Sequence, residues 1–376
     1  MDDAGFAAYV HIPFCAVRCG YCDFNTYTNT NFGVGASTSD FHESLATEID
    51  LSSRRLGTSG PLTSVFFGGG TPTMLDSAQL VAVLGKLRDT FGIAPGAEIT
   101  TEANPETVSE ESLGELVAGG FTRMSFGMQS AVPQVLHTLD RQHTPGQVTR
   151  AVKWARKLGL DVSVDLIYGA PGESLADWRT SLAAAIELGP DHISAYGLTI
   201  EPGTKMGAQL RRGEIAEPDP DELADKYLMA EELLSDSGYQ WYEVSNWCRP
   251  GHPSRHNLAY WQNKNWWGYG PGAHSHFNGT RWWNLKHPLS YAARLASGDL
   301  PVADYEELTD EERREEEIML GVRLREGISI PAGTAPSTVG ELIADQLIDA
   351  QAAFSGRIQL TVKGRLLADT VIRHLW

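Results

Sequence analysis

Residues 9–24, YVHIPFCAVRCGYCDF, contain the feature around which we expect the rest of the chain to be organised. The apolar residues at the start of this stretch are typical of a buried strand, and Cys15, Cys19 and Cys22 follow it within one short loop. Thiolates are the ligands that iron-sulfur clusters prefer, and a cubane cluster has four irons to ligate. Three cysteines leave one iron open, so the loop is a predicted 4Fe-4S site.

Two other uses of these thiols have to be weighed. A disulfide is disfavoured because such bonds are rare in the reducing cytosol, where we expect the chain to be. Structural zinc needs four ligands, and His11 is the candidate for the fourth, although it lies only four residues before Cys15 in the predicted strand. A metal-stabilised interaction protein therefore stays as an alternative.

The spacing CxxxCxYC, with Tyr21 directly before the last cysteine, resembles the signature of the radical S-adenosylmethionine (SAM) superfamily. In that superfamily the amino and carboxylate groups of SAM chelate the open iron, and an electron from the cluster cleaves the sulfonium to give a 5'-deoxyadenosyl radical. The resemblance implies SAM as a second cofactor, which the protein positions and shields.

Composition indicates a soluble globular protein that does not bind nucleic acid. The formal net charge of -18 over 376 residues leaves no basic excess to neutralise phosphates. No apolar run reaches the roughly 18 residues of a membrane span, and the N-terminus lacks the basic and apolar regions of a secretory signal. We therefore expect a cytoplasmic protein that reaches membranes only through partners.

The first 200 residues or so alternate between strand-like and helix-like segments. Glycine or polar residues end the apolar stretches, as in GGGTPT at 68–73 and DLIYGAPGE at 165–173. The spacing of apolar residues predicts helices at 40–56, 77–91, 109–118, 145–158 and 174–188. Such alternation predicts an α/β fold with a parallel sheet or open barrel, whose sites collect at the carboxyl ends of the strands.

Several polar side chains stand at or just beyond those predicted strand ends. They are Glu102, Asn104, Gln129, Arg141 and Asp165. Charged and amide groups there can hydrogen-bond the ribose and the methionyl part of SAM, and adjacent glycines at 68–70 let backbone amides approach a charged group closely. Each residue alone is as readily a helix cap or a surface ion pair. Together they indicate one pocket.

Further motifs make the resemblance more specific. YxHIPFC, GGGTPT, E-x-NP, S-x-G-x-QS, L-x-R-x-H, DLIYG-x-PGE and EPGT resemble, in this order, the oxygen-independent coproporphyrinogen III oxidase group and within it the HemW heme chaperones. That resemblance implies a partial (β/α)6 radical SAM barrel with a smaller α+β C-terminal domain. It also implies contacts to SAM, or in the case of Tyr21 a place beside the cluster, for Tyr9, Tyr21, Gly69, Gly70, Thr71, Glu102, Gln129, Arg141 and Asp165.

The composition changes after residue 203, where residues 205–223 are predicted to form a linker. We expect three units: the radical SAM barrel over residues 1–210, an extension rich in Trp and His over 211–300, and a winged-helix-like domain over 301–376. The few basic residues of the last unit give no reason to expect DNA binding.

Within this extension, residues 239–283 contain seven of the ten tryptophans and four histidines. Aromatic rings and imidazoles suit a large flat apolar ligand, where stacking is combined with axial ligation, but tryptophans that build a core or an interface are the alternative. HNLAYW at 256–261 resembles the HNxxYW motif of HemW proteins, which is associated there with heme. His256 is therefore the first candidate for a heme ligand, followed by His252, His274 and His276.

The resemblance leaves two functions open, a heme chaperone and an oxidase that decarboxylates porphyrinogen propionates with the deoxyadenosyl radical. The oxidases carry a longer N-terminal segment and another cysteine two positions after the third cluster cysteine, where this chain has Phe24. We therefore expect a chaperone that uses a 4Fe-4S cluster, SAM and heme and delivers heme to apoproteins, some of them at membranes. An electron donor is the other expected partner, and both enzyme activity and homodimer formation stay open.

Overall fold

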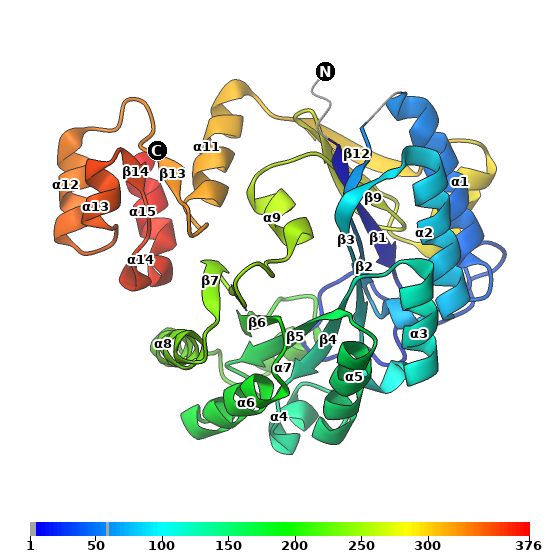
Figure 1. Cartoon of the computed structure of the whole chain (residues 1–376), viewed down its shortest axis with the longest axis horizontal. Coiled ribbons are helices and arrows are strands. Elements are labelled where there is room, and N and C mark those ends of the chain that lie inside the picture. The colour runs from blue at the N-terminus through cyan, green and yellow to red at the C-terminus, as the bar shows by residue number, and fades with distance from the viewer. Residues whose placement is uncertain (1–4, 58–59) are drawn as a thin grey trace.

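The computed structural model describes residues 5–57 and 60–376, and its largest feature is a 12-stranded sheet in the order β12-β11-β10-β9-β1-β2-β3-β4-β5-β6-β8-β7. Six central strands run parallel: β1 (Phe6–Ile12), β2 (Leu62–Gly69), β3 (Ile93–Ala103), β4 (Arg123–Gln129), β5 (Asp161–Tyr168) and β6 (His192–Gly197). They curve into an arc (Figure 1). Strands β12 and β7 are the two edges of this sheet, so the barrel is open. The predicted α/β fold with a partial barrel is confirmed.

Helices connect the parallel strands and cover the outer side of the arc (Figure 1). They are α1 (Phe41–Leu56), η1 (Pro72–Met74), α2 (Ser77–Phe91), η2 (Pro105–Thr107), α3 (Glu110–Gly119), α4 (Pro133–Thr138), α5 (Pro145–Lys157) and α6 (Leu175–Leu188). The five helices predicted from the sequence begin and end within one residue of their observed bounds. Local caps explain this agreement, because Ser109 and Ser174 each accept the amide three residues on, and Gly189 ends α6 in the left-handed conformation.

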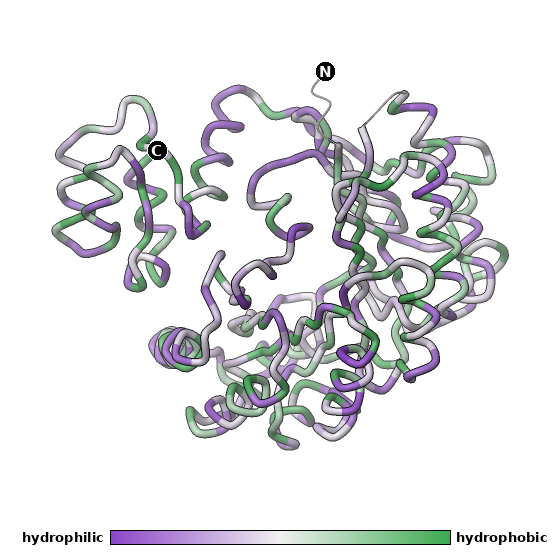
Figure 2. The backbone as a smooth tube through the Cα atoms, viewed as in Figure 1, coloured by the Kyte–Doolittle hydropathy of each residue, from purple (hydrophilic) through white to green (hydrophobic). Residues whose placement is uncertain are grey.

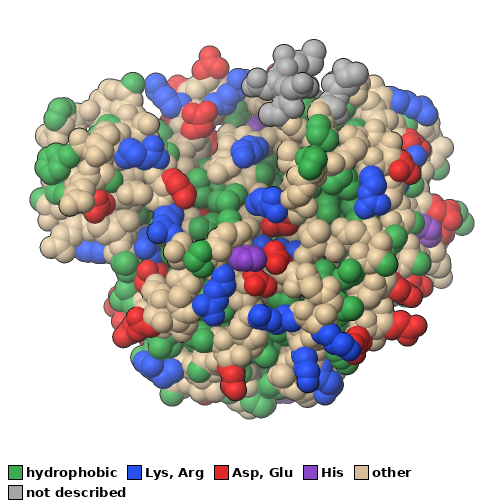
Figure 3. Space-filling view, viewed as in Figure 1, with side chains coloured by type: hydrophobic (Ala, Val, Ile, Leu, Met, Phe, Trp, Pro, Cys, Tyr) green, Lys and Arg blue, Asp and Glu red, His purple; other side chains and the backbone are tan. Residues whose placement is uncertain are grey.

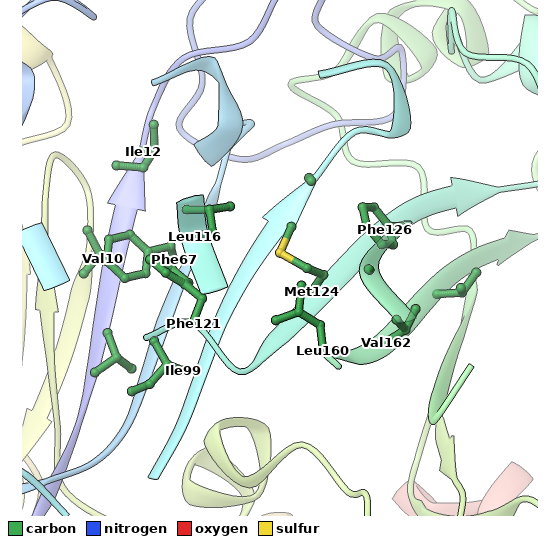
Figure 4. Close-up of a cluster of buried hydrophobic side chains, with 14 of the residues drawn as sticks. Val10, Ile12, Phe67, Ile99, Leu116, Phe121, Met124, Phe126, Leu160 and Val162 are labelled. Carbon is green, nitrogen blue, oxygen red and sulfur yellow. The ribbon is translucent and has the colours of Figure 1, made fainter. Parts of the chain in front are cut away.

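The main core lies between the parallel strands and their covering helices. Every residue of β1 except Tyr9 is buried, as expected for a strand covered on both faces. Figure 4 shows Leu116 of α3 against Phe67 and Phe121, with Met124 and its neighbours continuing the apolar layer toward β5. Figure 2 shows apolar stretches along these strands. Burial of these apolar side chains is the main force that packs the parallel strands against their helices and so keeps the strand ends together.

Residues 240–307 extend the same sheet at both edges. On one side β9 (Trp266–Tyr269) pairs with β1 and is followed by β10 (His274–Phe277), β11 (Thr280–Asn284) and β12 (Val302–Glu307); on the other side lie β8 (Asn246–Cys248) and β7 (Gln240–Glu243). Trp247 and Trp267 belong to the main core, so most of the region packs as part of the barrel. The helices of residues 211–300 are α8 (Pro220–Asp236), α9 (Arg255–Trp261) and α10 (Pro288–Ala296).

The predicted linker over residues 205–223 is helical at both ends, and only residues 212–219 between them lack a helix. Helix α7 (Lys205–Arg211) begins after Thr204, which caps it, and Met206 and Gly207 are buried, while α8 already begins at Pro220. The expected boundary at residue 210 therefore falls inside a packed helix. The content of charged residues, glycine and proline predicted no helix at residues 205–211. A short helix forms there nevertheless, because burial of Met206 and Gly207 packs it against the barrel.

The C-terminal end has a separate hydrophobic core that begins at Ile318 and includes Leu342, Ile358 and Val371. It is built from α11 (Asp310–Gly321), β13 (Ile328–Ser329), α12 (Pro336–Ala344), α13 (Ala350–Phe354), β14 (Arg357–Ile358), α14 (Val362–Leu366) and α15 (Ala368–Leu375). Because β12 pairs with β11, residues 302–307 belong to the main sheet and not to this unit. The winged-helix-like description of the unit stays a prediction.

Charged side chains of both signs are interspersed over the face of the molecule in Figure 3. Helix α11 is the most hydrophilic of the C-terminal helices (Figure 2), in keeping with its run of acidic and basic residues. Within residues 5–57 and 60–376, no helix combines the length and apolar character needed to cross a membrane.

Candidate cofactor site

A cavity of about 370 Å³ opens at the carboxyl ends of the parallel strands. Parallel strands end at the same edge of a sheet, so residues from five strands meet there. The cavity brings together every predicted site residue of the barrel except Tyr9, namely Cys15, Cys19, Tyr21, Cys22, Gly69, Gly70, Thr71, Glu102, Gln129, Arg141 and Asp165.

The loop after β1 presents its three cysteines to this cavity. A backbone bridge, from the Cys15 amide to the Tyr27 carbonyl at 3.0 Å, closes the loop, and the Cys22 amide donates to the Cys19 carbonyl at 3.2 Å. All three are free thiols. The fourth cysteine, Cys248, is buried in β8 and does not line the cavity. Three thiols that line one cavity could serve as the three protein ligands of an iron-sulfur cluster whose fourth iron is open.

His11 does not complete a zinc site with these cysteines. Its Nδ1 is 3.0 Å from the Tyr9 hydroxyl and its Nε2 is 2.9 Å from the Asn25 carbonyl, so both ring nitrogens are engaged. Burial lowers the pKa of His11 to about 4. A neutral imidazole with two hydrogen bonds is a structural group that positions Tyr9 and the far end of the cysteine loop.

Two glycines let strand β2 approach the cysteine loop. A Cβ at Gly70 would lie 2.6 Å from the Phe14 carbonyl oxygen and 3.0 Å from the Sγ of Cys15, so a side chain there would close the wall beside that thiol. Gly69 has a φ of 109°, and its amide donates to Oε2 of Glu102 at 3.1 Å. The glycine motif thus brings backbone close to both the thiols and an acidic side chain.

Arg141 links three parts of the cavity wall. Its Nη2 donates to Oδ1 of Asn104 at 2.7 Å and to the Gly127 carbonyl at 3.0 Å, while Nη1 lies 3.6 Å from the Sγ of Cys19. The buried Nε has no partner within the described residues. A fixed positive charge with an unused donor beside the thiols is suited to the carboxylate of an amino-acid ligand.

Two half-buried carboxyl groups, those of Glu102 and Asp165, line the same cavity. Burial, with Asp165 nearby, raises the pKa of Glu102 to about 8, although the Gly69 amide opposes the shift. Burial also raises the pKa of Asp165, which Ser194 and Ser125 counteract by donating at 2.7 and 2.8 Å. Carboxyl groups held in this way can hydrogen-bond the hydroxyl groups of a ribose.

Ser125 and Ser194 hold the Asp165 carboxyl group, and the sequence reasoning did not single them out. They lie on β4 and β6, the strands on either side of Asp165, and Ser194 is its direct partner in the register. The sequence does hold a signal for both. Each is a small hydroxyl residue between apolar residues of its strand, and each strand lies next to the strand that carries Asp165. Such a residue has to face a polar partner when it is buried.

Tyr9 lies outside the cavity, within the interior of the barrel. Its ring stacks on Phe66 with 6.3 Å between centroids, and its hydroxyl contacts His11. Tyr9 does not line the cavity in this conformation. Its predicted contact with SAM stays a prediction.

The structure places His256 in the core, where it hydrogen-bonds. The residue is 1% exposed; Nδ1 is 2.9 Å from the Ser64 hydroxyl and Nε2 is 2.7 Å from the Tyr260 hydroxyl. Burial lowers its pKa to about 3. Both ring nitrogens are engaged in hydrogen bonds in this conformation, and the heme-ligating role expected from HNLAYW stays a prediction.

The other three histidine candidates differ in their surroundings. Nδ1 of His252 lies 3.3 Å from Asp161 at the amino end of β5, and Nδ1 of the buried His276 lies 3.2 Å from the Lys264 carbonyl. His274 is exposed on β10. The structure therefore separates the four instead of gathering them around one site.

Comparison with known proteins agrees with this architecture. Residues 9–185 match the radical SAM superfamily. The whole chain is 47% identical to the heme chaperone HemW of Mycobacterium tuberculosis, of which it covers 96%. The chain belongs to the HemW family of radical SAM proteins. HemW of Bacillus subtilis is 32% identical over 97% of each chain.

The HemW-family fold is also seen in a solved structure. Coproporphyrinogen III oxidase (HemN) from Escherichia coli, a radical SAM enzyme, aligns with a TM-score of 0.84 over 99% of this chain and 90% of its own. The two sequences are 23% identical, so the likeness supports the shared fold alone.

Proposed function

We propose that this HemW-family protein binds a 4Fe-4S cluster through Cys15, Cys19 and Cys22 and binds SAM in the adjoining cavity. We further propose that it binds heme and delivers it to heme-requiring apoproteins. The observation that carries the cofactor part is that three thiols share one cavity with a half-buried arginine and two half-buried acids. The heme part is supported by 47% identity over the full chain to a protein named as a heme chaperone.

The cavity residues fit both cofactors chemically. Three thiolates leave one iron for the amino and carboxylate groups of SAM, and Arg141 offers its charge to that carboxylate. In this proposal Glu102 and Asp165 hydrogen-bond the ribose, while the cavity-lining side chains of Ile167 and Leu198 supply an apolar surface. When bound, the reduced cluster and SAM supply one-electron chemistry. The protein holds both and limits the access of water.

Three further features stay predictions from the sequence. They are an external electron donor for the cluster, delivery of heme to apoproteins at membranes, and a cytoplasmic location. Homodimer formation is still open.

The cluster proposal is tested by comparing two cysteine variants purified without oxygen. Cys19→Ala should lose iron and the broad visible absorption, because one of three ligands is gone. Cys248→Ala is the matched control and should keep both, since that thiol lies in β8 away from the cavity. Retention of iron by Cys19→Ala would contradict the proposal, and zinc in place of iron would favour a metal-stabilised interaction protein.

The chaperone proposal is tested on the reconstituted protein with SAM and a reductant. Stable heme binding, without decarboxylation of coproporphyrinogen III, supports the chaperone. Conversion to protoporphyrinogen with release of 5'-deoxyadenosine would overturn it in favour of the oxidase. Transfer of heme to an apoprotein, followed by absorbance after the two are separated, then tests delivery.

A further inference from the structure

A buried hydroxyl group next to the cysteine loop has no hydrogen-bonding role in the fold. Thr26 is 5% exposed, and its Oγ1 has no hydrogen-bond partner of ordinary geometry within residues 5–57 and 60–376. Thr26 does not line the cofactor cavity, so it is not placed to contact SAM there. Because buried hydroxyl groups are normally paired, this one indicates an acceptor that becomes available only when a ligand binds.

The backbone on both sides of Thr26 is fixed. The amide of Tyr27 donates at 2.7 Å, and its carbonyl accepts at 3.0 Å, to and from the segment that leads into Cys15. On the other side, the Asn25 carbonyl is 2.9 Å from Nε2 of His11. Thr26 is therefore held next to the first cysteine of the loop before any ligand binds.

Two sulfur atoms lie near the Thr26 hydroxyl. Burial raises the pKa of the Cys15 thiol to about 11, and the hydroxyl groups of Thr71 and Thr26 act in the opposite direction. Burial also raises the pKa of the Cys22 thiol, and Thr26 again acts in the opposite direction. A neighbouring hydroxyl group lowers the pKa of a thiol because it can donate to the thiolate. Thr26 thus lies behind two of the three cysteines, on the side away from the cavity.

The other two sulfur atoms already have a side-chain donor each. Oγ1 of Thr71 donates to Sγ of Cys15 at 3.9 Å, and Nη1 of Arg141 donates to Sγ of Cys19 at 3.6 Å. In the part of the chain that the structure describes, no such bond reaches Sγ of Cys22. A thiol is a weak acceptor and a thiolate is a strong one, so an unused donor beside Cys22 gains its partner when that thiol loses its proton to bind iron.

We propose that Thr26 donates a hydrogen bond to the thiolate of Cys22 when the cluster is bound, and thereby raises the reduction potential of the cluster. Reduction adds one electron from an external reductant, while the hydroxyl group keeps its proton and no bond breaks. A donor stabilises the more negative, reduced state, and hydrogen bonds to sulfur are among the factors that set such potentials. Thr26 is a positioning residue that acts through a cluster ligand. The inference rests on the proposed cluster in the cysteine loop.

The test is a redox titration of the full-length, anaerobically reconstituted protein with dithionite and mediators, followed by the electron paramagnetic resonance signal of the reduced cluster. Thr26→Val keeps the branched shape and removes the hydroxyl group. At a fixed applied potential its ratio of reduced to oxidised cluster should be roughly three- to tenfold below that of wild type, which for a one-electron couple is a downward shift of about 30–60 mV. Thr26→Ser keeps the hydroxyl group and should restore most of the wild-type potential.

Thr100→Val is the matched control. Thr100 is 1% exposed on β3, its Oγ1 likewise has no partner among the described residues, and it does not line the cavity. Thr100→Val should therefore titrate as wild type does. An equal downward shift in Thr100→Val would show that the potential responds to the loss of any buried hydroxyl group, and would overturn the role of Thr26.

The outcomes separate this inference from the function on which it rests. If the wild-type protein assembles no 4Fe-4S cluster, the cluster proposal itself is overturned. If wild type and Thr26→Val both hold the cluster at the same potential, only the role of Thr26 is overturned. If Thr26→Val retains too little iron to titrate, Thr26→Ala and Thr26→Ser make the same comparison, because they differ by the hydroxyl group alone. Equal potentials in that pair would also overturn the role, since a residue that only packs the loop changes iron content and stability but not the potential.

Discussion

The carboxylate of Glu98 accepts a hydrogen bond from the backbone amide of His256 at 3.2 Å, so a residue of the third strand fixes the start of α9 inside the barrel. It also accepts the amide of Arg255 and the hydroxyl of Ser254. Arg123 pairs with Glu98 at 3.3 Å, with side chains 3% and 5% exposed. The N-terminal end of the HNLAYW helix is therefore bound to the buried ion pair between Glu98 and Arg123.

Glu98→Ala should lower the free energy of unfolding by roughly 3–5 kcal/mol, because it leaves the charge of Arg123 buried without a partner. Urea unfolding followed by tryptophan fluorescence measures the change. Glu110→Ala is the control; its pair with Lys157 is exposed, so the loss there should be about 0–1 kcal/mol. Equal losses in both variants would show that the buried pair does not hold α9 as described.

His256→Ala should destabilise the protein by roughly 2–4 kcal/mol, since it creates a cavity and leaves the hydroxyls of Ser64 and Tyr260 without their shared partner. The same urea assay measures it, with His374→Ala expected within about 0.5 kcal/mol of wild type. An unchanged unfolding midpoint for His256→Ala would contradict the buried hydrogen bonds of the ring to Ser64 and Tyr260.

Local chemistry explains which parts of the fold could be predicted. The pair Ser109 and Ser112 and the left-handed Gly189 are recognisable within a few residues, and the helices they bound agree with the sequence. The site at the strand ends could be anticipated for the same reason. Glu102, Gln129 and Asp165 lie on three different parallel strands, each within a few residues of the carboxyl end, and the fold alone brings those ends together.

Long-range contacts explain what could not be predicted. The amide of His256 meets Glu98 from 158 positions away, and its ring meets Ser64 from 192 positions away. No pattern near the HNLAYW segment points to either partner. The sequence therefore does not distinguish the buried histidines of residues 239–283 from the exposed ones. The docking of α7 through Met206 likewise depends on a surface built elsewhere in the chain.

Arg141→Lys should weaken SAM binding by roughly 10- to 100-fold, which corresponds to the loss of about 1.5–3 kcal/mol from charge-assisted hydrogen bonds. Lysine keeps the charge but cannot reach Asn104, Gly127 and Cys19 at once with a planar fork. Equilibrium dialysis of SAM against reconstituted protein measures the affinity. Arg373→Lys, on the exposed side of α15, should bind SAM as wild type does. Wild-type affinity in Arg141→Lys would remove Arg141 from the SAM site.

Glu102 should make the stability of the protein depend on pH. Burial, with Asp165 nearby, raises its pKa from 4.5 to about 8. Between those values the folded protein holds a proton that the unfolded chain has released, so the free energy of unfolding falls as the pH rises through this window. Glu102→Gln removes the proton exchange and keeps an oxygen that can accept the Gly69 amide.

The stability of Glu102→Gln relative to wild type should therefore increase from a pH of about 4.5 to about 8 and change little outside that range. Urea midpoints at several pH values measure this difference, on protein prepared without iron or SAM, because both would alter the charges around the carboxyl group. Glu110→Gln serves as the exposed control and should track wild type. If the difference in urea midpoint between Glu102→Gln and wild type stays constant with pH, the carboxyl group titrates in its ordinary range. Glu102 would then be charged in the cavity at neutral pH, able to accept hydrogen bonds before any ligand enters.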